Sequence, residues 1–198
     1  MQLGIRFHDT KVLPLEERLA EVNRQGFSCV HLALSKVIKE NSVAPEALTP
    51  GYAMYLKRLF GAQKLDIAVL GCYLNLANPN PDKLSEIVEK YKAHIRFAAH
   101  LGCGVVGTET GAPNEEYKHE PACHSEEALE LFIKNLRPVV EYAEKMGVCI
   151  GIEPVYEHVM HNIDETLELL EKVGSSRVKI IWDAVNMLSP ETAKDQPG

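Results

Sequence analysis

Short apolar segments alternate with longer segments of helical periodicity along the whole chain. The apolar segments, each expected to form a β-strand, span residues 3–7, 29–34, 66–76, 104–108, 148–154 and 178–183. The longer segments, each expected to form a helix, span residues 15–24, 50–63, 82–100, 125–146 and 163–173. Strands that are separated by helices form parallel sheets. The pattern therefore predicts an α/β fold with six parallel strands.

The ends of the helical segments carry signals of their own. Gly26, Gly102 and Gly147 follow directly after helical periodicity, where a residue with positive φ ends a helix at low cost. Ser125 precedes two glutamates, which is typical of a helix start. The strand segments are almost continuously apolar, as in strands that are covered on both faces. No linker or low-complexity tract divides residues 1–198, so we expect a single domain.

Charge and cysteine usage narrow the class of protein. The chain has 28 acidic and 21 basic residues and a net charge of −7, which disfavours nucleic acid and anionic membranes as partners but not a small phosphorylated substrate. No segment reaches the ~18 apolar residues of a membrane span, and the N-terminus does not resemble a signal peptide. The five cysteines include no CxxC pair, and Cys29, Cys72 and Cys149 lie in strand segments. We therefore expect buried, reduced thiols and a cytoplasmic location.

Polar side chains gather after the carboxyl ends of the predicted strands. They are His8, Asp9, Ser35, Lys36, Asn75, Asn78, Glu109, Glu153, His158, Asp183 and Asn186. The turns at the opposite ends of the strands carry nothing comparable. Active sites of βα barrels and open α/β sheets lie at the carboxyl ends of the strands, so we expect the functional site there.

Two carboxylates in this set point to a metal. Glu153 ends one apolar strand segment and Asp183 ends the next. Neighbouring strands lie ~4.8 Å apart, and two carboxylates that close together raise each other's pKa unless a divalent ion neutralises both. The alternative is that each carboxylate pairs with a nearby Lys or Arg. We predict that Glu153 and Asp183 are metal ligands.

The other polar positions allow two interpretations each. Glu109 lies between glycines that let the backbone approach a ligand, but it could also be a solvated acid at a strand corner. His158 and His8 could contact substrate or lie on surface loops. A structural role is expected for the remaining histidines of the loops and of one helix, which are His94, His100, His119, His124 and His161. Trp182 is expected to pack between sheet and helix, and Cys72 and Tyr73 to pack in the core, with a substrate-lining role as the lesser alternative.

Five motifs together resemble a known family. They are Leu3–Asp9 (LGIRFHD), Ala68–Tyr73 (AVLGCY), Val106–Gly111 (VGTETG), Ile152–Val155 (IEPV) and Ile181–Leu188 (IWDAVNML). In this order and spacing they resemble the sugar-phosphate isomerase/epimerase family of xylose-isomerase-like TIM barrels. The match spans nearly the whole chain. The specific segments are GTETG and the DAVNML part of the last motif, whereas the first-strand motif alone would be weak.

The resemblance implies a site at the mouth of a (β/α) barrel. A divalent metal (Mn, Mg, Zn or Co) is held in the family by Glu, Asp, His and Glu on strands five to eight, and Glu153 and Asp183 match the first two. Glu153 would also be the catalytic acid/base. The expected substrate contacts are His8, Asn75, Glu109, His158 and Asn186. Many ketose epimerases of the superfamily carry a His where this chain has Asn186, so only hydrogen bonding is expected of that position.

The chain shows only about six βα units, so strands seven and eight of the family are missing. Six strands leave the first and the sixth unpaired, and two carboxylates fall short of the four to six ligands that a divalent ion takes. We expect a C-terminally truncated barrel that need not bind metal as it stands. The alternative is closure by a second copy of the chain, a homo-oligomer.

The function expected from the resemblance is metal-dependent isomerisation or epimerisation of a small sugar or sugar phosphate, by proton transfer next to a carbonyl. Two alternatives remain. One is a non-catalytic sugar-binding or assembly protein on a degenerate barrel, which Asn186 and the missing strands favour. The other is a zinc-dependent abasic-site endonuclease, which the net charge of −7 disfavours.

Overall fold

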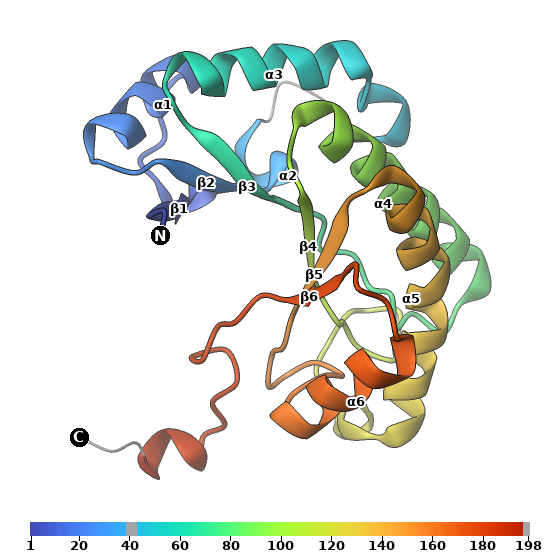
Figure 1. The fold of residues 1–198 in the computed structure, drawn as a ribbon. Helices are drawn as coiled ribbons and strands as arrows, with labels where there is room; N and C mark the ends of the chain where they lie inside the picture. The colour runs from blue at the N-terminus through green and yellow to red at the C-terminus, as the bar shows by residue number, and fades with distance from the viewer. Residues whose placement is uncertain (39–42, 196–198) are drawn as a thin grey trace. The chain divides into compact units, whose positions relative to one another are not determined.

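Six strands form one parallel sheet in the order in which they occur along the chain (Figure 1). The computed structural model describes residues 1–38 and 43–195. The strands are β1 (Gly4–Arg6), β2 (Cys29–Leu32), β3 (Asp66–Gly71), β4 (Val105–Glu109), β5 (Cys149–Glu153) and β6 (Val178–Ile180). The predicted six-stranded α/β fold is confirmed, and the sheet order ends at β1 on one side and at β6 on the other.

Helices follow the strands as the periodicity predicts. They are α1 (Leu15–Arg24), α2 (Leu34–Val37), α3 (Pro50–Ala62), α4 (Pro81–Leu101), α5 (Glu126–Met146) and α6 (Ile163–Val173). Short 3-10 turns lie at Phe7–Asp9, Pro45–Ala47, Pro121–His124 and Thr192–Asp195. These five short pieces, α2 and the four 3-10 turns, carry too few residues to show a periodicity, and none of them was predicted.

Local capping explains where the helices begin and end. The Asn162 side chain accepts a hydrogen bond from the Glu165 N–H at 2.9 Å and starts α6, and Thr49 does the same for Tyr52 in α3. Gly174 ends α6 in the left-handed region at φ 65°.

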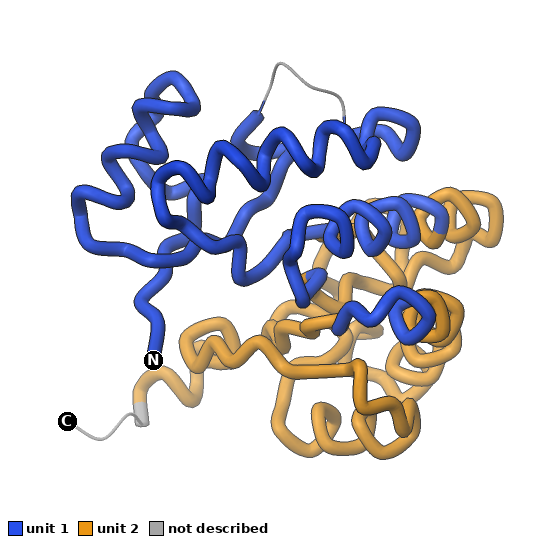
Figure 2. The backbone as a smooth tube through the Cα atoms, turned by 45° about the horizontal axis from the view of Figure 1, so that its top comes forward, with its two compact units in different colours: residues 1–72, 89–106, 143–149 blue, residues 73–88, 107–142, 150–198 orange. Residues whose placement is uncertain are grey.

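The chain divides into two compact units, which Figure 2 shows in blue and orange. Unit 1 comprises residues 1–72, 89–106 and 143–149. Its core includes Phe7 and Phe60, whose ring centroids lie 5.6 Å apart. The guanidinium of Arg18 lies 4.6 Å from the centre of the Phe7 ring and donates to the Phe7 carbonyl, so a buried cation is satisfied inside this core.

Unit 2 comprises residues 73–88, 107–142 and 150–198. The fully buried side chains Phe132, Leu136, Ile150, Ile152 and Leu169 form part of its core. The division into two units does not test the expectation of a single domain, which stays a prediction.

Burial corrects two expectations. The strands are not uniformly covered: β1 is mostly exposed and the first four residues of β3 alternate between exposed and half-buried. Trp182 does not pack between sheet and helix, because 62% of it is exposed.

The five cysteines are free thiols, four of them buried and Cys149 half-buried. In the part of the chain that the structure describes, every helix is too short or too polar to cross a bilayer.

Candidate active site

The buried carboxylate of Glu153 lies at the carboxyl end of β5 in unit 2. Only 8% of this residue is exposed, because the strand that carries it is buried from Ile150 onward. A buried carboxylate is costly without hydrogen-bond donors. The Asn186 side-chain amide supplies one: Nδ2 donates to Glu153 Oε1 at 2.7 Å.

Asp183 lies three residues after β6 and is held by a turn of the backbone. Its Oδ1 accepts from the backbone N–H groups of Val185 (3.0 Å) and Asn186 (3.3 Å). Asn186 therefore contacts both carboxylates, one through its side chain and one through its backbone. Its carbonyl also accepts from the Tyr156 N–H at 2.7 Å, which joins the loop after β5 to the loop after β6. The structure thus brings Glu153, Asp183 and Asn186 together.

The oxygen donors of Glu153 and Asp183 are of the kind that divalent cations prefer. Within residues 1–38 and 43–195, however, no three His, Cys, Asp or Glu side chains form a group that could hold a metal ion. The two carboxylates fit a metal as part of a ligand set and do not complete one. Whether they bind a metal stays a prediction.

A second polar group is centred on Glu109, the last residue of β4. Tyr117 Oη donates to Glu109 Oε2 at 3.2 Å, and His158 Nδ1 lies 3.6 Å from the same oxygen. The Tyr117 and His158 rings are 5.3 Å apart. The structure therefore brings together two predicted residues, Glu109 and His158. It adds Tyr117, which was not predicted, because an aromatic residue in a polar loop is the only signal of it in the sequence.

Ionisation in this group is shaped by burial and by the carboxylates. Burial raises the pKa of Tyr117 far above its ordinary value, and the charges of Glu109 and Glu153 act in the same direction. Burial lowers the pKa of His158, although Glu109 opposes the shift. Tyr117 is thus a permanent hydrogen-bond donor, and the neutral imidazole of His158 is favoured at neutral pH.

The loop after β4 is fastened by Asn75. Asn75 Nδ2 donates to the carbonyls of Ala112 (2.9 Å) and Asn114 (2.7 Å), and its Oδ1 accepts from the N–H groups of Ala77 and Ala112. Gly111 lies against this amide at φ 80°, where an added Cβ would be 2.2 Å from Asn75 Oδ1. The Asn75 amide is engaged by the loop, and its predicted contact with substrate stays untested.

His8 lies in unit 1, on the 3-10 turn after β1. Arg6 donates to His8 Nε2 at 3.0 to 3.2 Å, and the His31 ring packs edge-on at 5.7 Å. His8 Nδ1 is buried without a hydrogen-bond partner. Burial lowers the pKa of His8, with Asp9 opposing the shift and Arg6 adding to it. His8 is therefore a neutral side chain near pH 7, and its predicted role in binding substrate stays a prediction.

Three histidines that were expected to be structural form a cluster with Tyr156 in unit 2. The His124 and His161 rings stack at 3.7 Å, and the His119 ring lies 5.3 Å from His124. His124 Nε2 lies 2.6 Å from the Tyr156 carbonyl, and His161 Nδ1 lies 2.8 Å from Glu165 Oε2. These contacts support the structural interpretation, because they hold the loop that follows β5.

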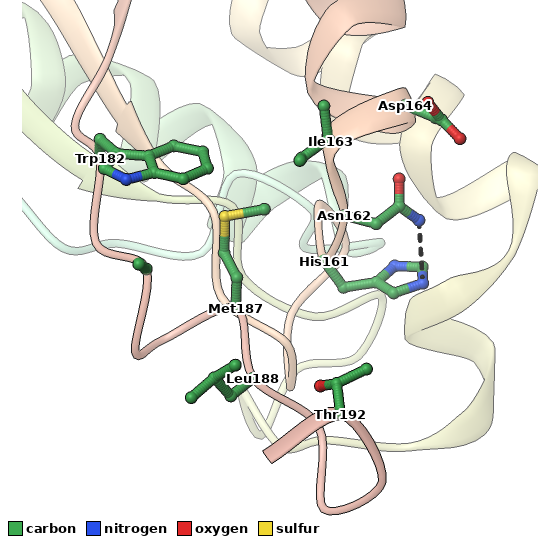
Figure 3. A pocket seen from close by; sticks show the side chains of 9 residues that line it. His161, Asn162, Ile163, Asp164, Trp182, Met187, Leu188 and Thr192 are labelled. Carbon is green, nitrogen blue, oxygen red and sulfur yellow. Dashed lines mark hydrogen bonds between the residues drawn. The ribbon is translucent and has the colours of Figure 1, made fainter. Parts of the chain in front are cut away.

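A pocket of about 500 Å³ lies beside Trp182, also in unit 2 (Figure 3). It is lined by His161, Asn162, Ile163, Asp164, Trp182, Ala184, Met187, Leu188 and Thr192. Figure 3 shows the Trp182 indole and the Met187 thioether on one side of the pocket, with Asn162 and His161 hydrogen-bonded to each other on the other. Trp182, which was expected to pack between sheet and helix, therefore lines an open pocket. In the sequence it directly precedes Asp183.

Comparison with solved structures shows what the fold is similar to. The IolI protein, solved with a bound zinc atom, superposes with a TM-score of 0.72 at 18% identity over 94% of this chain and 64% of its own. D-psicose 3-epimerase from Clostridium cellulolyticum H10, solved with D-tagatose, superposes with a TM-score of 0.71 at 17% identity, over 91% of this chain and 62% of its own. A xylose isomerase-like TIM barrel/4-hydroxyphenylpyruvate dioxygenase fusion protein superposes with a TM-score of 0.72 at 17% identity, over 100% of this chain and 30% of its own. The chain thus spans less than two thirds of the length of these proteins.

A search of curated proteins by sequence gave no significant match. The sequence pattern of one family, described as the xylose isomerase-like TIM barrel, matches residues 19–196. The fold and the polar strand ends define a partial α/β barrel of this kind. The chain belongs to the xylose isomerase-like TIM barrel family, as the resemblance of its motifs predicted.

Proposed function

We propose that the chain carries part of the metal site of an isomerase or epimerase that acts on a small sugar or sugar phosphate by proton transfer next to a carbonyl. The family and the fold support this proposal, since D-psicose 3-epimerase has a similar fold. The observation that carries it is the gathering of Glu153 and Asp183 around Asn186 at the ends of consecutive strands.

Glu153 and Asp183 would hold a divalent ion (Mn, Mg, Zn or Co) by their carboxylate oxygens. The backbone N–H groups on Asp183 and the Asn186 amide on Glu153 orient these oxygens before any ion binds. When bound, the ion would supply Lewis-acid stabilisation of the negative charge that develops on the substrate oxygens. Further ligands would have to come from the substrate, from water or from another segment of polypeptide.

Proton transfer would be the task of Glu153. Its carboxylate would take the proton from the carbon next to the carbonyl on one side, and another residue would return it. Burial of Glu153 keeps competing water away from it. Glu109, His158 and Asn186 would hydrogen-bond substrate hydroxyls, with Asn75 holding the loop after β4.

Thermal unfolding with Mn²⁺ tests the proposal on the chain as it is. An ion at 100 times its Kd stabilises the folded state by about 2.7 kcal/mol, which for this size raises Tm by roughly 5–10 °C. We expect this rise for the wild type and its loss in Glu153→Gln and in Asp183→Asn. Glu157→Gln, which removes an exposed acid from the loop after β5, is the matched control and should keep the rise.

Solvent-deuterium exchange into D-fructose, followed by NMR, tests the chemistry itself. Exchange at the carbon next to the carbonyl should require Mn²⁺ and Glu153. A wild-type chain whose Tm does not respond to Mn²⁺, and that exchanges no deuterium, contradicts the proposal.

The second candidate is a non-catalytic sugar-binding or assembly protein. It is favoured by the Asn186 amide on Glu153 and by the lack of a three-residue ligand group among the described residues. It predicts that a sugar binds equally well with and without Mn²⁺. An abasic-site endonuclease is disfavoured by the net charge of −7.

A further inference from the structure

His158 has a buried ring nitrogen that lies beside a carboxylate. His158 Nδ1 has no hydrogen-bond partner and lies 3.6 Å from Glu109 Oε2. This separation is too long for a hydrogen bond and short enough to become one after a small side-chain rotation. Unsatisfied buried polar atoms are rare in folded proteins, so this one calls for an explanation.

The backbones that carry Glu109 and His158 are fastened to each other. The Val159 N–H donates to the Gly111 carbonyl at 3.0 Å, and the Met160 N–H donates to Thr110 Oγ1 at 3.0 Å. A turn closed by the His158 N–H and the Val155 carbonyl, 2.9 Å apart, holds the histidine itself. The pair of side chains therefore sits on a rigid support.

Tyr117 is held in an unusual conformation beside this pair. Its φ of 56° lies in the left-handed region, which costs a bulky residue on the order of 1–3 kcal/mol. In this conformation Tyr117 Oη donates to Glu109 Oε2 at 3.2 Å and the ring packs on His158. Such strain persists where the surroundings impose it, and here it places a hydroxyl on the oxygen that faces His158.

The carboxylate decides which nitrogen of His158 carries the proton. A neutral imidazole has one N–H and one lone pair, and an ionised carboxylate only accepts hydrogen bonds. A lone pair on Nδ1 would face the negative Glu109, whereas an N–H there would be attracted to it. The lone pair is then on Nε2.

We propose that Tyr117 is a positioning residue: by anchoring Glu109 it holds His158 as the Nδ1–H tautomer, so that Nε2 accepts a hydrogen bond from a ligand hydroxyl. The ligand class is the neutral polyhydroxyl part of a sugar, because a phosphate oxygen has no proton to donate to Nε2 and is repelled by Glu109. The assignment of the ligand class rests on the proposed function, whereas the assignment of the His158 tautomer does not.

Long-range ¹H–¹⁵N correlation of the imidazoles at pH 7.5 tests the tautomer in the ligand-free, metal-free chain. We expect His158 to be Nδ1–H in the wild type and the Nε2–H form to become populated in Tyr117→Phe, which keeps the ring and removes the hydroxyl. His158→Gln identifies the signal. Tyr55→Phe, which removes an exposed hydroxyl in unit 1, is the control. His161, 2.8 Å from Glu165 through Nδ1, should stay Nδ1–H in every variant.

Titration with D-fructose in the presence of Mg²⁺, a diamagnetic ion that leaves the imidazole signals sharp, tests the ligand. The Nε2 signal should shift in the wild type, and the Kd should weaken about fivefold in Tyr117→Phe, as expected for one hydrogen bond. D-fructose 6-phosphate should shift Nε2 no more than D-fructose does.

Two outcomes separate this inference from the proposed function. An Nε2–H wild type, or a Tyr117→Phe chain that keeps the wild-type tautomer, overturns the positioning role whatever Mn²⁺ does. A Tm that does not respond to Mn²⁺, together with the expected tautomers, overturns the proposed function and leaves the positioning role supported.

Discussion

Asn186 contacts both carboxylates of the candidate active site, so its substitution should affect the hydrogen bonding of both. Its amide donates to a Glu153 that is 8% exposed, and its backbone N–H donates to Asp183. The resemblance to ketose epimerases identified this position only as the place of a missing histidine. The structure gives the asparagine a role of its own, because its side-chain amide donates a hydrogen bond to the buried Glu153 carboxylate.

Asn186→Ala should destabilise the chain by about 1–3 kcal/mol, because a buried carboxylate loses a donor. Chemical denaturation followed by circular dichroism measures the change. Val185→Ala next to it removes an exposed side chain and should cost less than about 0.5 kcal/mol. Equal effects of the two substitutions would show that the amide contributes nothing specific.

His31 makes stability depend on pH. Burial lowers its pKa to about 4, and the neighbouring His8 and Arg6 act in the same direction. The unfolded chain, with a pKa near 6.5, therefore binds more protons than the folded chain between these two values. The stabilisation is fully present above pH 6.5 and is lost as the pH falls toward 4.

His31→Gln should flatten this dependence, by on the order of 1–2 kcal/mol between pH 7 and pH 4 after allowance for partial exposure. Urea unfolding at a series of pH values measures it. His100→Gln, at an exposed histidine of α4, serves as the control and should keep the wild-type slope. A His31→Gln chain that loses stability on acidification as steeply as the wild type contradicts the assignment to His31.

Residues of the candidate site could be selected to the extent that they lie at or just after the ends of strands. Glu109, Glu153 and Asp183 were selected in this way, since parallel strands place their carboxyl ends at one edge. Tyr117 could not be found, because its contact depends on a left-handed backbone eight residues beyond β4. The hydrogen bonds from the Asn75 amide to the loop after β4 could not be predicted either, because nothing in the sequence indicates which carbonyls this amide contacts.

At the scale of elements, helices follow the sequence more closely than strands do. Both α1 and α6 have the predicted bounds, since the 3.6-residue period marks their extent, and α6 is also capped by Asn162 and Gly174. The third and sixth strands are shorter than predicted, ending at Gly71 and Ile180. Their apolar residues continue past the strand ends into the loops, and hydrophobicity alone does not show where a strand stops.

The loop after β4 depends on a glycine that no other residue can replace cheaply. Gly111→Ala would strain a φ of 80° and would bring a Cβ to 2.2 Å from Asn75 Oδ1, so we expect a loss of at least about 2 kcal/mol. Gly61→Ala in α3 is the matched control: nothing lies within 4 Å of the added Cβ, and the helix should gain about 0.5–1 kcal/mol. Denaturant midpoints of the two variants should move in opposite directions. If both moved the same way, the tight approach of Gly111 to Asn75 would not limit stability.

For the whole molecule, the sheet order ends at β6, and a terminal strand invites pairing with another chain. Exposed apolar side chains lie on the segments around it, among them Ile163, Leu167, Trp182 and Val185. The one charged residue within β6 is Lys179, and it is exposed. A lysine on a terminal strand opposes edge-to-edge pairing, because its charge would have to be desolvated between two strands.

Lys179→Ile should therefore make the chain aggregate faster on heating. The strand would read Val-Ile-Ile, a short apolar β-former beside an exposed apolar surface. Light scattering at a fixed temperature below Tm measures the rate, and we expect an increase of about threefold or more. Lys134→Ile, on an exposed position of α5, changes the net charge by the same amount and adds the same side chain away from a terminal strand. Because overall repulsion is equal in the two variants, a faster rate for Lys179→Ile alone locates the effect at β6, and equal rates would exclude it.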